Sequence, residues 1–246
     1  MHTPRHGLAR VLSKRGVCSR TQAATWIREG RVRVDGRTVL DPEFPIHSFD
    51  QVIEVAGGAA VDAFVYLALN KPRGLLTTTR DERGRDTVYR CFDGTPLPWI
   101  APVGRLDKAS EGLLLFSNDP EWAARITDPV TGPCKTYHVQ IDRLPSPDLL
   151  EALRRGVLDE GERLAARAVD VLREGGRNAW LQVVLDEGRN RHIRRLMAAH
   201  EVGVLRLVRT AIGAVELGTL AKGGWRMLAA GEAEGLAPRS IPRATG

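Results

Sequence analysis

The stretch GRLDKASEGLLLFSND, residues 104–119, places charged side chains directly before an apolar run. Asp107 lies between Arg105 and Lys108, a few residues before the apolar residues 113–116. A solvated loop needs no apolar neighbour, and an unpaired acid destabilises a buried strand. A carboxylate held at the edge of a core is typical of side-chain chemistry, because the adjoining strand keeps it in place. Asp107 is therefore a candidate for catalysis.

Other interpretations of this acid remain open at this point. Glu111 follows four residues later, which raises the possibility of a glycosidase-type carboxylate pair or a metal site. A retaining pair needs its carboxyl groups about 5 Å apart, and the sequence does not establish that spacing. Asp107 can also cap a turn before Ala109 and Ser110, or form an exposed ion pair with Arg105 that stabilises little.

Two further segments carry side chains suited to chemistry, KTY at 135–137 and EGRNRHIRR at 187–195. The ring of a tyrosine on a strand usually packs in the core, while its hydroxyl forms a hydrogen bond. The second segment has four arginines within seven residues, a density typical of a solvent-facing surface or a phosphate site. Each segment alone indicates no function.

The composition limits the class of protein. A chain of 246 residues can form one or two domains with a sizeable core, and its apolar and charged fractions are ordinary for a globular protein. It has no apolar run of about 18 residues, and its first residues lack the apolar core of a secretory signal. Cys18, Cys91 and Cys134 are far apart without a CxxC pair. This argues against a zinc site or a disulfide framework and favours a reducing cytoplasm.

The net charge of +6 is concentrated at one end. Residues 1–37 hold nine Lys/Arg and two acids, so this segment carries +7 and the rest sums to about −1. Such a segment is either a solvated surface or a module that binds a polyanion, and nucleic acid is the favoured partner.

The basic segment predicts two short helices followed by a hairpin. Leu8, Val11 and Leu12 have helical spacing, and Ser19 is placed to cap a second helix that ends near residue 30. RVRVDGRTVL, residues 31–40, alternates around an Asp-Gly pair and predicts a hairpin.

The remainder predicts strands and helices without regular βαβ alternation, which favours an α+β fold with a mixed or antiparallel sheet flanked by helices. Strands are expected near 64–71, 113–116, 135–141, 179–188 and 204–217, and helices near 120–129, 146–157 and 190–201. We predict a small basic domain at 5–56, a linker at 57–62, a catalytic domain at 63–235 and a flexible tail at 236–246.

GVCSRTQAATWIREGRVRVDG, residues 16–36, resembles the small RNA-binding module named after the ribosomal small-subunit protein S4. That family usually has two basic residues after the serine, whereas here Arg20 is followed by Thr21. The resemblance implies a set of RNA contacts in this module: Lys14, Arg20, Arg28, Arg31 and Arg33.

GRLDKASEGLLLFSND, KTYHV and EGRNRHIRRL resemble, in this order, three motifs of the pseudouridine synthases of the RsuA/RluB/RluE/RluF group. NKPRGLLTT, residues 70–78, resembles the start of that family's catalytic domain, and the whole match runs from about Leu8 to Met227. The resemblance implies the pseudouridine synthase fold and an isomerase. It would replace the N1 glycosidic bond of a uridine in RNA by a C5–C1′ bond, without a cofactor or metal.

The motifs also imply roles for individual residues. Asp107 would act as nucleophile or base, which requires an ionised carboxylate, and Arg194 matches its cationic partner. Tyr137 matches the tyrosine that stacks beneath the target base. Arg105, Lys71 and Arg191 are predicted RNA contacts. His192 replaces the family's usual Gln, which we interpret as a change in supporting hydrogen bonds; a catalytic base is the alternative.

We therefore expect a cytoplasmic, monomeric enzyme that modifies ribosomal RNA, either free or in a subunit precursor, with large-subunit RNA favoured over small-subunit RNA. The target base must be flipped out of its stack to be reached. The alternative from another class is a non-catalytic ribosomal-RNA-binding or ribosome-assembly protein on the same fold. A carboxylate-pair hydrolase that uses Glu111 is the third hypothesis.

Overall fold

The computed structural model describes residues 6–47, 51–57, 64–78 and 83–237. The predicted linker lies outside these residues apart from position 57, and so does the predicted tail apart from 236–237. The chain divides into two compact units. The first comprises Met1–Tyr66, Thr95–Ala101 and Phe116–Glu121, and the second comprises the remainder.

The N-terminal part of the first unit contains the predicted helices and hairpin. Its elements are β1 (His6–Gly7), α1 (Leu8–Lys14), α2 (Arg20–Arg28), β2 (Val32–Val34), β3 (Arg37–Thr38), β4 (Pro45–Ile46) and β5 (Ile53–Val55). The Ser19 hydroxyl accepts a 3.1 Å hydrogen bond from Gln22 N and caps α2 as predicted. Asp35 and Gly36 have φ values of 49° and 77°, which suit the two-residue turn of the hairpin.

The core of this part comes from one face of each helix and from β2. Leu8, Leu12, Ala23, Ile27 and Val32 are buried together. The charged residues of α1, α2 and β2 lie on the other faces and are exposed, so the fold presents basic side chains on a small, well-packed support.

The rest of the described chain contains both strands and helices. The strands are β6 (Tyr66–Lys71), β7 (Ala101–Val103), β8 (Glu111–Ser117), β9 (Lys135–Ile141), β10 (Val157–Asp159), β11 (Glu162–Leu164), β12 (Ala168–Glu174), β13 (Ala179–Leu185), β14 (Val204–Ile212), β15 (Val215–Glu216) and β16 (Trp225–Met227). The helices are the 3₁₀ turn η1 (Val88–Phe92), α3 (Pro120–Thr127), α4 (Pro147–Arg155), α5 (His192–Ala198) and α6 (Ala230–Leu236).

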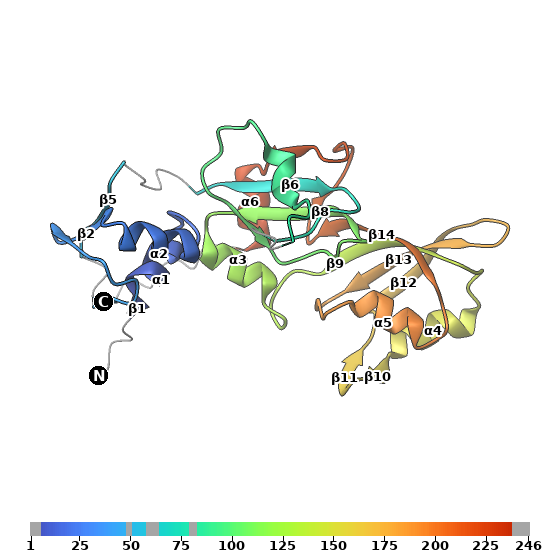
Figure 1. Cartoon of the computed structure of the whole chain (residues 1–246). Coiled ribbons are helices and arrows are strands. Elements are labelled where there is room, and N and C mark those ends of the chain that lie inside the picture. Colours follow the sequence, from blue (N-terminus) through green and yellow to red (C-terminus); the bar gives the residue numbers. More distant parts are fainter. Residues whose placement is uncertain (1–5, 48–50, 58–63, 79–82, 238–246) are drawn as a thin grey trace. The chain divides into compact units, whose positions relative to one another are not determined.

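A nine-stranded mixed sheet organises these elements. Its order is β12-β13-β9-β14-β8-β6-β16, with β15 on β14 and β7 on β8. Strands β12, β13, β9 and β14 pair antiparallel, whereas β14 pairs parallel with β8. Figure 1 shows β9, β13 and β12 side by side, with α4 and α5 on the same side of them. The predicted α+β fold with a mixed sheet is confirmed.

Strand β9 positions the residues that matter for function. Its side chains alternate between buried and half-buried, and Lys135 and Tyr137 are on the buried face. Tyr137 is opposite Val183 on one neighbour and Arg209 on the other. Because directly opposed residues point to the same face of a sheet, Arg209 and Tyr137 share this face.

Strand β8 is buried along its whole length, as the apolar run 113–116 predicted. Gly112 permits its close approach to β14, since it has φ +99° and a Cβ there would lie 2.2 Å from the Arg209 carbonyl oxygen. Within the described residues, no helix has the length and apolar character needed to cross a bilayer.

Candidate active site

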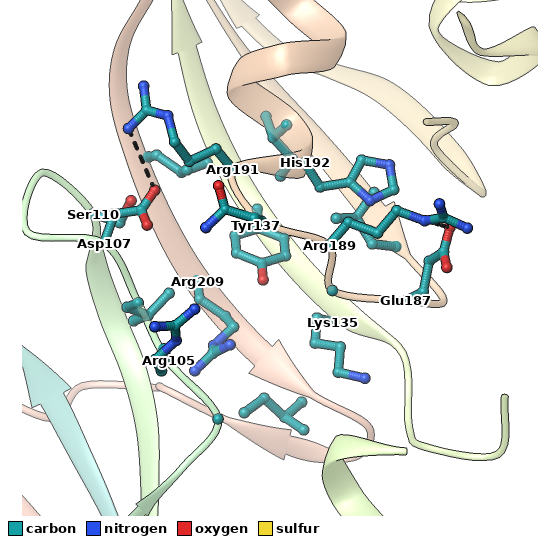
Figure 2. A pocket seen from close by; sticks show the side chains of 18 of the residues that line it. Arg105, Asp107, Ser110, Lys135, Tyr137, Glu187, Arg189, Arg191, His192 and Arg209 are labelled. Atoms are coloured by element: carbon teal, nitrogen blue, oxygen red, sulfur yellow. Dashed lines mark hydrogen bonds and ion pairs between the residues drawn. The ribbon is translucent and has the colours of Figure 1, made fainter. Parts of the chain in front are cut away.

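A cavity of about 330 Å³ opens in the second unit, where the three sequence segments meet. Segment 103–107 forms one wall, β9 and β14 contribute Tyr137 and Arg209, and segment 187–194 forms the opposite wall (Figure 2). The volume lies in the range of sites for small ligands, about 300–1,000 Å³. Basic side chains outnumber acidic ones six to two in its lining: Arg105, Lys135, Arg189, Arg191, Arg194 and Arg209 against Asp107 and Glu187. The cavity therefore attracts anionic ligands.

Asp107 lies in a turn between β7 and β8 that backbone hydrogen bonds hold in place. Ser110 N donates to the Asp107 carbonyl at 3.0 Å, and Gly74 N donates to the Lys108 carbonyl at 2.7 Å. The Thr77 hydroxyl donates to the Leu106 carbonyl at 2.7 Å. The carboxylate, about one third exposed, thus projects from a rigid turn into the cavity.

Lys71 supports the same turn from inside the protein. Its ammonium is fully buried and donates to the carbonyl oxygens of Pro72, Asp107 and Ser110 at 3.0, 3.2 and 2.9 Å. Burial lowers the pKa of Lys71 to about 8, against the opposing effect of the Asp107 and Glu111 charges. The prediction that Lys71 contacts RNA is wrong, because its donors are already used within the protein.

Arg191 is the ion-pair partner of Asp107 in the described residues, with Nη1 3.8 Å from Oδ2 (Figure 2). It precedes α5 in a left-handed conformation with φ 50°, uncommon for a residue other than glycine. Such conformations are concentrated at functional sites.

Arg194 lies one helical turn further along α5 and bonds to backbone. Its guanidinium donates to the Ala109 carbonyl at 3.3 Å and to the Val204 carbonyl at 3.4 Å. Burial and the Arg191 charge lower the pKa of Arg194, whereas Asp107 raises it. Arg194 therefore lies within the field of Asp107 and also holds the turn that carries it, while Arg191 makes the direct ion pair.

Tyr137 lies centrally in the cavity, between Asp107 and Arg189 in the view of Figure 2. The side chain is largely buried in β9, so its position follows from the sheet register. Arg105 lines the same cavity but is exposed, as expected of a residue that contacts a large ligand at the rim.

His192 is buried, and its Nε2 lies 3.1 Å from the carbonyl oxygen of Ala165. Burial is the main cause that lowers the pKa of His192, so the ring is neutral at pH 7. With a neutral ring, Nε2–H donates to Ala165 and ties α5 to the segment before β12. In Figure 2 the ring lies on the side of Tyr137 away from Asp107. This geometry matches the supporting role rather than that of a base.

A charged cluster that the sequence analysis did not predict anchors α5. Arg195 donates to Glu162 at 2.6 Å and also pairs with Asp159, so it holds the hairpin β10–β11 against the helix. Arg189 bonds to Glu187 at 2.8 Å within the loop that lines the cavity. The two pairs of Arg195 join residues more than 30 positions apart, which sequence spacing does not reveal.

Glu111 is outside the cavity, and the carboxylate-pair hypothesis is wrong. Glu111 is only 3% exposed, and Arg206 binds both its oxygens at 2.7 and 3.1 Å. Lys222 adds a contact of 2.6 Å. Its register partner on β14 is Val208 and not Arg209, so Glu111 faces the opposite side of the sheet from Tyr137.

No group of three or more His, Cys, Asp or Glu side chains is arranged to hold a metal ion in the part of the chain that the structure describes.

The five predicted RNA contacts of the first unit, Lys14, Arg20, Arg28, Arg31 and Arg33, are all exposed. Arg20 pairs with Glu43 at 3.1 Å, and the guanidinium of Arg31 lies 5.1 Å from the centre of the Trp26 ring. Exposed pairs of this kind are weak, so these side chains remain free to exchange partners.

Comparison with known proteins agrees with this arrangement. The S4 domain model matches residues 7–52, and the RNA pseudouridylate synthase model matches residues 65–199. A crystal structure of a pseudouridylate synthase superposes with a TM-score of 0.65 at 28% identity, covering 94% of this chain and 99% of that one.

Sequence relatives extend over nearly the whole chain. The ribosomal large subunit pseudouridine synthase B of Bacillus subtilis is 35% identical over 239 residues, which are 96% of this chain and 94% of the relative. An uncharacterized RNA pseudouridine synthase of Mycobacterium tuberculosis is 40% identical over 232 residues, covering 92% and 90%. The fold and the sequence relatives are those of an RNA-modifying isomerase. The chain belongs to the RNA pseudouridylate synthase family and carries an S4 domain at its N-terminus.

Proposed function

We propose that this protein converts a specific uridine of ribosomal RNA to pseudouridine, with large-subunit RNA favoured, and that Asp107 is its catalytic residue. The observation that carries the proposal is the rigid turn that presents Asp107 to one cavity with Tyr137 and Arg191. The Bacillus subtilis relative named for the large ribosomal subunit supports the choice of RNA.

The reaction is an isomerisation that needs no external oxidant or reductant. The N1–C1′ bond of uridine breaks, the C5–C1′ bond forms, and the proton on C5 is lost while N1 gains one. An ionised Asp107 can attack the nucleotide or remove a proton, and Arg191 forms an ion pair with it at the edge of the cavity.

Tyr137 would stack beneath the flipped uracil, and Arg105 would contact the backbone of the flipped nucleotide. Flipping a base out of its stack costs a few kcal/mol. Phosphate contacts by exposed arginines at the rim, including Arg191, offset this cost. No step of this scheme requires a group beyond the side chains of the cavity.

The N-terminal S4 domain would bind the RNA that surrounds the target, through its exposed Lys14, Arg20, Arg28, Arg31 and Arg33. We propose the domain limits 5–56 and 63–235, joined by the linker 57–62 and followed by a tail from 236. The partner of the protein would be ribosomal RNA or a subunit precursor, and the protein would bind it as a monomer in the cytoplasm.

The test uses ribosomal RNA transcribed with tritium at C5 of uridine. Wild type should release tritium from large-subunit RNA, and Asp107→Asn should release none while it still binds the RNA and melts at the same temperature. Small-subunit RNA is the matched control for the choice of substrate.

Two outcomes would contradict the proposal. Release by Asp107→Asn would exclude Asp107 as the catalytic residue. Binding without release by wild type, on free RNA and on assembled subunits alike, would favour a non-catalytic assembly protein.

A further inference from the structure

Two buried basic side chains, Lys135 and Arg209, lie in the cavity without an assigned role. Lys135 is two residues before Tyr137 on the same face of β9, and Arg209 is directly opposite Tyr137 on β14. Their exposed fractions are 8% and 5%, and both line the cavity. Figure 2 shows them at the hydroxyl end of Tyr137, on either side of it.

Neither cation is fully paired within the protein. Arg209 Nε donates to the Leu113 carbonyl at 2.7 Å, which orients the guanidinium, but its Nη2 is buried with no hydrogen-bond partner among the described residues. No hydrogen bond or ion pair joins the Lys135 ammonium to another described residue. Buried charges without partners are unfavourable, so such groups usually meet a ligand.

The electrostatics of the pair point to an anionic ligand. Burial and then the Arg209 charge lower the pKa of Lys135, while Cys134, Asp186 and Asp128 act in the opposite direction. Two cations that disfavour each other at one buried position are both stabilised when a negatively charged oxygen is placed between them.

The proposed reaction produces such an oxygen in this cavity. When the N1–C1′ bond breaks, its electron pair stays on the base, and the charge is shared by N1, O2 and O4 of the uracil ring. A base stacked on Tyr137 with its sugar toward Asp107 directs its carbonyl edge away from Asp107. In Figure 2 Lys135 lies beyond the hydroxyl end of Tyr137 on the side away from Asp107, and Arg209 lies at the same end on the side nearer Asp107, so an oxygen at this end lies between the two cations.

We propose that Lys135 and Arg209 together hold a carbonyl oxygen of the flipped uracil and stabilise the negative charge that it carries when the N1–C1′ bond breaks. This inference rests on the proposed function. It makes both residues catalytic, because cations positioned before the charge develops stabilise a transition state more than a ground state.

A backbone phosphate is the other anionic group that RNA could supply, and burial decides against it. Exposed cations such as Arg105 can reach a phosphate that stays hydrated at the rim. Lys135 and Arg209 are more than nine-tenths buried, so they can be reached by a flat base inserted into the cavity.

The test compares two leaving groups under single turnover. Ribosomal RNA is transcribed with uridine or with 5-fluorouridine, whose fluorine stabilises the anion of the base, and the C5-linked nucleoside is measured after nuclease digestion. With uridine, Lys135→Met should lower the rate constant about 100-fold. With 5-fluorouridine the loss should be at least several-fold smaller.

Matched variants separate charge from folding. Lys135→Arg keeps the charge and should recover most of the rate. Arg209→Gln keeps a donor for the Leu113 carbonyl but not the charge, and should show the same dependence on fluorine. Arg177→Met removes an exposed charge in the turn before β13, away from the cavity, and should leave the rate unchanged.

Equal losses with both RNAs would overturn the inference and assign Lys135 to folding or to RNA binding, which melting temperatures and Kd distinguish. A weaker Kd with an unchanged rate constant would assign a phosphate contact instead. A rate constant of Lys135→Met within threefold of wild type would exclude a catalytic role for Lys135. Wild type that forms no pseudouridine would instead contradict the proposed function.

Discussion

The ammonium of Lys71 donates a hydrogen bond of 3.2 Å to the backbone carbonyl of Asp107 and another of 2.9 Å to that of Ser110. Both carbonyls belong to the turn that presents the Asp107 carboxylate to the cavity. A buried lysine thus bridges the two ends of the turn, so the position of the carboxylate depends on a residue that does not reach the cavity itself.

Lys71→Met should therefore weaken both stability and activity. The substitution removes the three hydrogen bonds of a buried ammonium, to the carbonyls of Pro72, Asp107 and Ser110, which lowers the free energy of unfolding by about 3 kcal/mol. A displacement of Asp107 by about 1 Å lowers kcat about 100-fold. Denaturant unfolding and tritium release measure the two effects. Lys108→Met, an exposed neighbour, should change stability by less than about 0.5 kcal/mol. An unchanged kcat in folded Lys71→Met would show that the turn keeps Asp107 in position without Lys71.

Gly112→Ala should destabilise the sheet where β8 meets β14. Its Cβ would lie 2.2 Å from the Arg209 carbonyl oxygen, so the strands must separate or the backbone must rearrange. Gly161→Ala is the matched control, since Gly161 also has positive φ but no atom within 4 Å of an added Cβ. We expect a loss of about 1 kcal/mol for the control and at least about 2 kcal/mol more for Gly112→Ala, measured by denaturant unfolding. Equal losses for Gly112→Ala and Gly161→Ala would show that β8 can shift enough to accommodate the added methyl group.

Glu111 should make the free energy of unfolding depend on pH in the acid range. The hydrogen bond from Arg206, with help from Lys222, lowers the pKa of Glu111 to about 2. A carboxyl whose pKa is lowered on folding contributes stability above its unfolded pKa of about 4.3, and this contribution is lost as the pH falls toward 2. The free-energy difference between wild type and Glu111→Gln should be about 2 kcal/mol at pH 6 and shrink steadily from pH 5 to pH 2.

Unfolding titrations at fixed ionic strength measure this difference. Glu174→Gln, which changes an exposed carboxyl on β12, is the matched control. A pH-independent difference for Glu111→Gln would contradict the assignment of the ion pair as the cause.

His192→Gln separates the two interpretations of this position. An amide can also donate to the Ala165 carbonyl, so a supporting role predicts kcat within about fivefold of wild type. A catalytic base predicts a loss of about 100-fold or more. His192→Leu, which removes the hydrogen bond but keeps the apolar volume, should lose about 1–2 kcal/mol of stability. Tritium release and thermal unfolding measure the two readouts.

Local patterns anticipated the elements that have strong periodicity or a cap. The helices α2 and α4 begin after Ser19 and Ser146, whose hydroxyls accept backbone hydrogen bonds, and the hairpin turns at the Asp-Gly pair. The hairpin β10–β11 and the edge strand β12 were not predicted. Strands β10 and β11 are short, and most of the residues of β12 are exposed. The ion pairs of Arg195 help to hold the hairpin from another part of the chain.

The sequence by itself determined the class of fold, the family and the three segments that meet at the cavity, because motif order and strand alternation are properties of neighbouring residues. The tertiary structure alone decided which charges meet. It placed Lys71 inside the protein, Glu111 behind the sheet, Arg191 against Asp107, and Lys135 with Arg209 in the cavity. The reason is physical: the partner of a charge is set by sheet register and burial, which join residues far apart in the chain.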